Sequence, residues 1–381
     1  MSHVPSNNDI DRRRFIKLAG GGATALFLLP LLQGCDNHTV VPLGDPETFS
    51  FITPNDTFFV QNGGEGAISG WSEPSFANEQ AWSLKIRDVS NEVRTFTWND
   101  LMGVAAEPGE EITILKTIEC VLQSTVRATL TGFTGNAYWT GVRLTRLLDI
   151  AGFDYSEETR YKRIVFTGAD GFINNVRPQR LRDTSLLSPL LVYRMNGLPL
   201  PPEHGFPVRI IMQEGYGYKN VKWPVDIQGV PADIEFGTYQ DQGFVDDGIS
   251  RVNSRATSIF EDAQISSGPT ELIGFSLSGF APIARVEVSI DDAAPVEAEI
   301  VPIAEIIENE GLPGSIRQIA ESEPYPYRGV WTPWRLTWEA TAGPHTIRIK
   351  AVDAAGNEQP PEDESVSDGL TAVTEYHITV G

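Results

Sequence analysis

The chain has 381 residues, of which 41% are hydrophobic and 21% are charged. This composition is typical of a globular protein with room for two domains, and it excludes a disordered chain. The formal net charge of -22 argues against nucleic-acid binding, because no net-basic surface is available to release the counterions of phosphates.

The first 35 residues have the features of an export signal. Residues 12–17 read RRRFIK, a twin-arginine pattern, and an apolar run at 23–32 follows that is too short to span a bilayer. The sequence LQGC at 32–35 resembles a lipobox, in which Cys35 would carry a lipid; ordinary cleavage near Gly34 and an uncleaved anchor are the alternatives. We therefore expect export by the twin-arginine route to the periplasm or cell envelope, with membrane contact only through a lipid on Cys35.

A polar linker at 36–47 precedes an expected first domain at 48–240, whose patterns mix helices and strands. The predicted elements are a turn and a short aromatic strand at 53–62, a strand at 82–86, a capped helix at 97–101, an apolar strand ending at Cys120, a helix led into by 135–142 and stopped by Gly152, a strand at 164–166, and a strand with a tight hairpin at 190–197.

The pattern changes after residue 240. A polar, glycine-rich stretch at 241–257 predicts a crossover or linker. The expected second domain, 258–381, has short strands separated by turns at 271–278, 284–290, 334–339, 345–352 and 376–380. This spacing predicts an antiparallel β-sandwich of immunoglobulin type, interrupted by a long irregular insertion at 302–328.

Cys120 is one of only two cysteines. A cysteine at the end of an apolar strand is most often a small core residue. If Cys35 carries a lipid, however, Cys120 has no intramolecular partner. An unpaired thiol in an exported protein is a liability unless it is buried or ligated.

Several motifs occur in one order along the chain. They are FFVQN at 58–62, the lone Cys120, NAYWTGVRL at 136–144, GADG at 168–171, MNGLPLPPEHGFPVR at 195–209 and GYGYKNVKW at 215–223, followed by VEVSID at 286–291 in the second domain. In this order they resemble the sulfite oxidase family of molybdenum enzymes across essentially the whole mature length. The resemblance implies an α+β molybdopterin-binding domain followed by an immunoglobulin-like dimerisation domain, and hence a homodimer.

The resemblance also implies a molybdenum held by the dithiolene of one molybdopterin, with Cys120 as the single thiolate ligand from the protein. A soft thiolate suits such a metal. The implied cofactor-binding residues are Phe59, Val60, Gln61, Asn62, Cys120, Asp170, His204, Arg209, Asn220, Val221 and Lys222.

Local chemistry agrees with some of these assignments. Arg209 offers a fork for phosphate, and the turn before Lys222 offers backbone N–H groups beside an ammonium. The alternatives are a hydrogen-bonded turn histidine for His204, an exposed lysine for Lys222, and side chains that cap their own backbone for Asn62 and Asp170.

The chain departs from the family at the expected substrate residues. Gln61 and Thr125 stand where the resemblance predicts two substrate-binding arginines. Losing two cationic donors weakens the binding of a dianion, since hydrogen bonds to charged groups contribute about 1.5–3 kcal/mol each. Arg127 would compensate only if its loop repacks, and Arg335 of the second domain could reach the mouth of the site. The catalytic candidates are thus Cys120, Gln61, Thr125 and Arg335.

We therefore expect a molybdopterin-dependent oxidoreductase that performs two-electron oxygen-atom transfer on a small substrate less anionic than sulfite. The sequence has no CxxCH haem motif and no cysteine set for an iron–sulfur cluster, so electrons would pass to a separate carrier such as a cytochrome. The alternatives are a reductase of sulfoxide-type substrates and a non-catalytic, lipid-anchored scaffold that keeps the fold.

Overall fold

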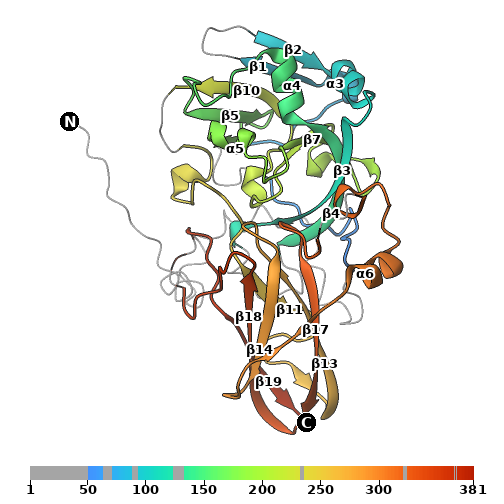
Figure 1. Ribbon diagram of the computed structural model, residues 1–381, viewed down its shortest axis with the longest axis vertical. Coiled ribbons are helices and arrows are strands. Elements are labelled where there is room, and N and C mark those ends of the chain that lie inside the picture. Colours follow the sequence, from blue (N-terminus) through green and yellow to red (C-terminus); the bar gives the residue numbers. More distant parts are fainter. Residues whose placement is uncertain are drawn as a thin grey trace, which may run out of the picture.

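The computed structural model describes residues 50–62, 71–87, 93–122, 133–231, 236–320, 324–363, 365 and 367–381. Its described strands form two β-rich units, one above the other in Figure 1. The upper, N-terminal unit runs from blue to yellow, and the lower, C-terminal unit is orange and red with the C-terminus at its tip. No helix in the described part is long and apolar enough to cross a membrane.

The first sheet of the N-terminal unit brings together strands from its beginning and its end. Its order is β2 (Val93–Thr97), β1 (Ser83–Arg87), β10 (Pro224–Val230), β5 (Arg163–Gly168) and β6 (Ile173–Val176), with β1 and β10 parallel. The helices and 3-10 turns of this unit are η2 (Glu79–Ala81), α3 (Trp98–Ala105), α4 (Leu144–Ala151), α5 (Pro178–Arg182), η4 (Pro202–His204), η5 (Gly217–Lys219) and η6 (Gln240–Gln242). Apolar side chains of β1, β5, α3 and α4 share one buried core.

The second sheet carries Cys120. Its strands are β3 (Glu111–Glu119), β4 (Thr134–Arg143), β7 (Leu190–Met195) and β8 (Leu198–Pro199), with β9 (Arg209–Ile211) paired to β7. β3 and β4 pair antiparallel from Glu111 opposite Val142 to Glu119 opposite Thr134. Because β3 ends at Glu119, Cys120 follows at once in the core.

Local sequence signals explain several of these elements. Thr97 caps α3 and exchanges hydrogen bonds with Asp100, as a capping box does. Gly152 ends α4 at a φ of 69°, a conformation that suits glycine. Asn196 and Gly197 both have positive φ and close the β7–β8 hairpin. These three predictions from the sequence are confirmed.

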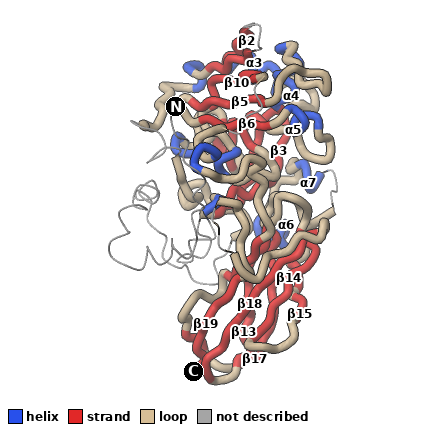
Figure 2. The backbone as a smooth tube through the Cα atoms, turned by 90° about the vertical axis from the view of Figure 1, so that its left-hand side faces the viewer, coloured by secondary structure: helices blue, strands red, loops and turns tan. Residues whose placement is uncertain are grey.

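The C-terminal unit is a sandwich of two sheets around one core (Figure 2). One sheet has the order β11 (Asn253–Ala256), β13 (Gly268–Leu277), β17 (Thr332–Ala340) and β16 (Glu299–Ile300). The other has the order β12 (Gln264–Ile265), β19 (Thr374–Val380), β18 (Gly343–Asp353), β14 (Ile283–Ile290) and β15 (Val296–Glu297). The five predicted strands correspond to β13, β14, β17, β18 and β19, and the first, 271–278, runs one residue past the end of β13. The immunoglobulin assignment stays a prediction.

Three expectations differ from the structure. Residues 58–61 form no strand, because Phe58 packs against Trp139 and His204 while its backbone joins no ladder. The 135–142 segment does lead into a helix, as expected, and is itself part of strand β4. The insertion at 302–328 is partly helical, with α6 (Ile303–Glu310) and α7 (Arg317–Ala320). The sandwich begins before residue 258, because β11 already pairs with β13.

Part of that insertion covers the free edge of β3. The side-chain amide of Gln318 accepts from the N–H of Leu115 at 3.0 Å and donates to its carbonyl at 2.9 Å. Farther along, Thr117 donates its N–H to the carbonyl of Gly329 at 2.9 Å. The strand that leads to Cys120 is therefore bonded on one side by β4 and on the other by the C-terminal half of the chain.

Candidate cofactor site

Cys120 is a buried thiol held from two directions. Its side chain and backbone together are 4% exposed, and its N–H donates to the carbonyl of Phe133 at 2.9 Å. Its Sγ donates to Oε1 of Gln61 at 2.9 Å. No disulfide is formed at Cys120. The residue therefore presents one sulfur toward the 58–62 segment.

A cavity of about 550 Å³, counting its open mouth, lies beside this contact. Its lining combines two cations with aromatic and polar groups from six separate parts of the chain. The lining residues are Phe58, Phe59, Gln61, Ile118, Asp170, Phe172, Arg209, Gly217, Tyr218, Asn220, Val221, Lys222, Trp223 and Tyr239. Seven of the predicted cofactor residues are among them, which brings together Phe59, Gln61, Asp170, Arg209, Asn220, Val221 and Lys222.

Arg209 is a buried cation with no carboxylate bonded to it among the described residues. It is 4% exposed, and it donates only to backbone carbonyls, those of Asn220 at 3.2 Å and His204 at 3.5 Å. Its guanidinium also lies 5.5 Å from the centre of the Trp139 ring. Burial lowers the pKa of Arg209 to about 9. An anionic ligand in the cavity would supply the charge that the protein does not.

Lys222, which lines the cavity, is hydrogen-bonded to the 61–62 segment. Its ammonium donates to the carbonyl of Gln61 at 3.3 Å, to Oδ1 of Asn62 at 2.5 Å and to the carbonyl of Glu203 at 2.6 Å. Burial and the nearby charge of Arg209 lower the pKa of Lys222 well below its usual range. A negatively charged ligand near both cations would favour the charged form of each.

Gly205 lets the chain pass close to the residues that carry the two cations. Gly205 has a φ of 110°, and a Cβ there would stand 3.2 Å from Cβ of Lys222 and 3.3 Å from Cβ of Arg209. A larger residue would be strained in its backbone and would press on both cations.

Other predicted residues have structural duties. Asn220 uses its amide inside its own turn, bonding the N–H of Met212 and the carbonyls of Gly215 and Tyr216, so its side chain is not aimed at a ligand. Nε2 of His204 donates to the carbonyl of Asn55 at 3.2 Å, which is the turn role considered as its alternative.

Of three further predicted cofactor residues, only Asp170 lines the cavity; Asn62 and Val60 do not. Asn62 donates to Glu73, and Asp170 accepts from the N–H of Phe172 at 3.0 Å. Burial raises the pKa of Asp170, which lies at the cavity wall. Val60 is half-buried and is not part of the cavity lining.

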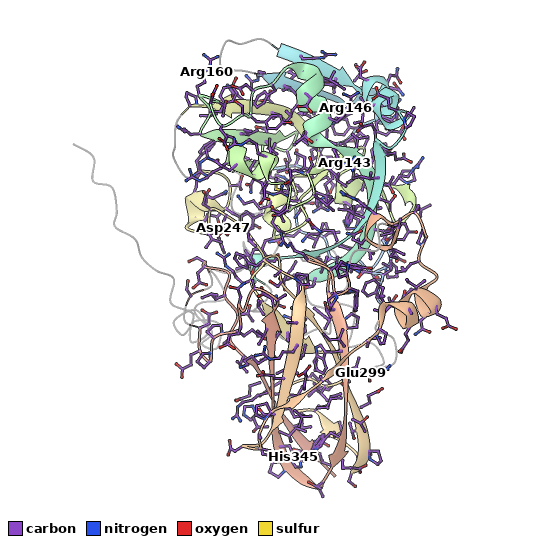
Figure 3. The ribbon with its side chains drawn as sticks, viewed as in Figure 1. Arg143, Arg146, Arg160, Asp247, Glu299 and His345 are labelled. Carbon is purple, nitrogen blue, oxygen red and sulfur yellow. The ribbon has the colours of Figure 1, made fainter. Side chains whose placement is uncertain are left out.

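Arg335 does not take part in this site, which corrects the expectation that it reaches the mouth. Its guanidinium donates to both oxygens of Glu299, at 3.0 and 2.9 Å, and to Glu305 at 2.8 Å. Glu299 lies on the sandwich, away from the N-terminal unit (Figure 3). Two carboxylates therefore hold Arg335 in the C-terminal unit. Thr125 and Arg127 lie outside the described residues.

The sequence did not single out Tyr218, Trp223 or Tyr239. Tyr239 accepts from Nε2 of Gln61 at 3.1 Å and stacks on Tyr218, with ring centroids 5.0 Å apart. Trp223 has a φ of 50°, and no described group accepts from its buried indole N–H. An aromatic residue within the polar stretch around Tyr239, and a tryptophan ending the GYGYKNVKW motif, were the available signals.

These residues fit a cofactor that brings its own anionic groups and its own metal ligands. Arg209, Lys222 and the indole N–H of Trp223 are buried donors around one cavity, with one soft thiol at its side. Among the described residues, no group of three or more His, Cys, Asp or Glu side chains could hold a metal. A metal next to Cys120 would therefore take further ligands from a bound group.

The fold and this donor set define a molybdopterin-binding domain. The sequence model of the family described as "Oxidoreductase molybdopterin binding domain" matches residues 72–235, which include Cys120, Arg209 and Lys222. Residues 72–235 of the chain thus form a molybdopterin-binding domain, which agrees with the resemblance that the motifs carry.

Relatives and a solved structure agree with this assignment. Human mitochondrial sulfite oxidase is 25% identical over 346 residues, covering 82% of this chain and 58% of its own length. The NADPH nitrate reductase of Fusarium oxysporum is 28% identical over 220 residues, covering 53% of this chain and 22% of its own. The sulfane dehydrogenase SoxCD from Paracoccus pantotrophus matches with a TM-score of 0.66 at 19% identity, covering 87% of this chain and 82% of the matched chain. The chain thus spans 58% of the length of the human relative.

Proposed function

We propose that the protein is an exported molybdenum oxidoreductase in which Cys120 is the thiolate ligand of a molybdenum–molybdopterin cofactor. The observation that carries the proposal is a buried sulfur beside a cavity whose wall holds two cations without a bonded carboxylate among the described residues. When bound, the cofactor supplies two-electron redox chemistry and oxygen-atom transfer.

The chain's own residues bind and orient that group. Arg209 and Lys222 neutralise an anionic pterin tail, and the tail in turn restores the favourable environment that burial denies to both cations. Phe58, Phe59 and Tyr239 line the cavity with aromatic rings, which leave less room for water beside a bound group.

The substrate we propose is small and less anionic than sulfite. Gln61 puts a neutral amide at the cavity wall where the family resemblance predicts an arginine. Arg335, which could have replaced that charge, is bound to Glu299 and Glu305. Arg209 and Lys222 are assigned to the cofactor, so a dianionic substrate meets no further cation among the described lining residues.

Metal and pterin analysis of the full, exported chain tests this function. Wild type from a host that makes the cofactor should hold roughly one molybdenum per chain, since the site offers one thiolate. Cys120→Ser should lose the metal while its circular dichroism is unchanged, and Cys35→Ser, which removes the only other cysteine, should keep it. Wild-type protein with less than about a tenth of an equivalent would overturn the proposal.

A substrate screen separates the enzyme alternatives. Oxidation of sulfite or of a neutral sulfur compound with reduction of an electron acceptor supports the oxidase direction. Oxidation of a reduced dye by sulfoxides, without acceptor reduction, supports a sulfoxide-type reductase instead. A Cys120→Ser variant that functions as well as wild type in its native host favours a lipid-anchored scaffold.

Export, the electron carrier and dimerisation belong to the same proposal. The RRRFIK pattern and the LQGC sequence support twin-arginine export with a lipid on Cys35. Arg12→Lys with Arg13→Lys should retain the protein in the cytoplasm, and Cys35→Ser should release it from the membrane fraction. Light scattering of the full chain tests the homodimer, and reduction of added cytochrome during turnover tests the carrier.

A further inference from the structure

The amide of Gln61 is occupied at both ends. Oε1 accepts from Sγ of Cys120 at 2.9 Å, and Nε2 donates to the hydroxyl of Tyr239 at 3.1 Å. A side-chain amide has one acceptor end and one donor end, so each of these contacts uses one end. Gln61 is therefore built into a bridge between a sulfur and a phenol and does not stand as an isolated group facing the cavity.

The bridge is anchored in its backbone and at its far end. The ammonium of Lys222 bonds the Gln61 carbonyl and the Asn62 side chain, which positions a segment that no β-ladder supports. Tyr239 stacks on Tyr218 with an interplanar angle of 13° and meets Phe244 edge-on at 5.4 Å. The groups at both ends of the Gln61 amide are thus held in place, and a rotation about its last bond exchanges its two ends without moving them.

Metal binding reverses what the sulfur needs from this amide. A thiol donates its hydrogen to Oε1, whereas a metal-bound thiolate has no hydrogen and would face the lone pairs of the same oxygen. A half-turn of the amide points Nε2–H at the sulfur and Oε1 at Tyr239. The hydroxyl of Tyr239 tolerates this exchange, because a phenol can either accept or donate.

We propose that Gln61 is a positioning residue for the metal ligand, whose amide turns to donate an N–H to the Cys120 thiolate when that sulfur binds a metal. The inference rests on the proposed function, since it assumes that Cys120 ligates molybdenum. It also gives Gln61 a role other than substrate binding. The residue acts on the sulfur and does not neutralise the charge of a substrate.

A hydrogen bond to a ligating sulfur reduces its electron donation and raises the reduction potential of the metal. The experiment is an EPR-monitored redox titration of the full, metal-loaded chain, with metal content measured first. Gln61→Met keeps the length and removes both bonds, so it should lower the midpoint potential. A tenfold change in the ratio of oxidised to reduced metal at a fixed potential is about 59 mV for a one-electron couple.

Two further variants and a control should give an order of midpoint potentials that a merely structural role of Gln61 would not produce. Gln61→Glu keeps the shape but offers no donor, so its potential should fall below that of Gln61→Met. Tyr239→Phe keeps the amide and loses its anchor, and should shift the potential in the same direction by less. It is the variant to measure if Gln61→Met loses its metal. Gln242→Met, at an exposed glutamine of the neighbouring η6 turn, should leave the potential unchanged.

The outcomes separate this inference from the proposed function. Loaded Gln61→Met and Tyr239→Phe with wild-type potentials, or Gln61→Glu with a potential above that of Gln61→Met, overturn the inference alone. Wild-type protein without molybdenum overturns the proposed function and this inference with it. The predicted order, at equal metal content, supports the bridge.

Discussion

Replacing Arg209 by methionine should make the cofactor-free protein more stable and the cofactor less tightly held. Burial lowers the pKa of Arg209 to about 9, and one pKa unit corresponds to about 1.4 kcal/mol, so holding this charge inside is unfavourable by on the order of 4–5 kcal/mol. Its two bonds to backbone carbonyls are long, 3.2 and 3.5 Å, so losing them offsets about 3 kcal/mol of that, at about 1.5 kcal/mol each. The net expected gain is about 1–2 kcal/mol in the free energy of unfolding.

The loaded protein should respond in the opposite direction. One charge-assisted hydrogen bond to an anionic pterin tail is worth about 1.5–3 kcal/mol, which weakens cofactor retention roughly 10- to 150-fold. Urea unfolding of full-length chain from a cofactor-deficient host measures the first effect, and pterin release from loaded protein measures the second.

Arg163→Met is the matched control for this prediction. Arg163 is equally buried but donates to Asp246 and, at 3.2 Å, to Asn175. Removing it leaves a carboxylate uncompensated, so this variant should lose about 3 kcal/mol. If Arg209→Met is destabilised as much as Arg163→Met and still retains its pterin, Arg209 is not a cation that lacks an anionic partner in the cofactor-free protein.

Three further results are expected. Gly205→Ala should lower stability by about 1–3 kcal/mol and reduce molybdenum content, since the backbone is left-handed there and the new Cβ presses on both cations; a normal urea midpoint would contradict this. Arg335→Ala should keep metal content and turnover and lose at most about 1 kcal/mol, because its pairs are half-exposed; a fall in turnover would place it back in the site. The carbonyl of Thr341, with Asp291, raises the pKa of His345, so this contribution to stability is full below the ordinary histidine pKa and is lost as pH rises through the raised value. Asp291→Asn should therefore differ most from wild type at acidic pH in urea titrations, and a pH-independent difference would exclude the His345 contact.

The sequence predicted elements whose signals are local. Helix α4 shows an apolar face and a glycine stop within nine residues. Asn196 and Gly197 alone predict the β7–β8 hairpin. Residues 58–61 have strong β-propensity, yet aromatic packing of Phe58 against Trp139 decides their conformation. Gly141 is a second position where a contact distant in sequence decides which residue fits. A Cβ there would stand 2.1 Å from the carbonyl of Leu191 on the neighbouring strand.

The candidate site divides in the same way. Arg209 and Lys222 were found because each lies in a recognisable motif, and the structure brings both to one cavity. Tyr239 was missed because its place depends on stacking with Tyr218 and on a bond from Gln61, which lies 178 residues earlier. Arg335 was misplaced because the sequence could not show Glu299 and Glu305 beside it.

The seal that Gln318 and Gly329 form along β3 also bears on how the molecule can be divided. An unpaired strand edge is a template for pairing with another chain. A fragment ending near residue 240 would lose that seal and expose Leu115 and Thr117 on the strand that leads to Cys120. Such a fragment should self-associate through β3. By bonding the edge of β3, the C-terminal half of the chain prevents this aggregation of the N-terminal half.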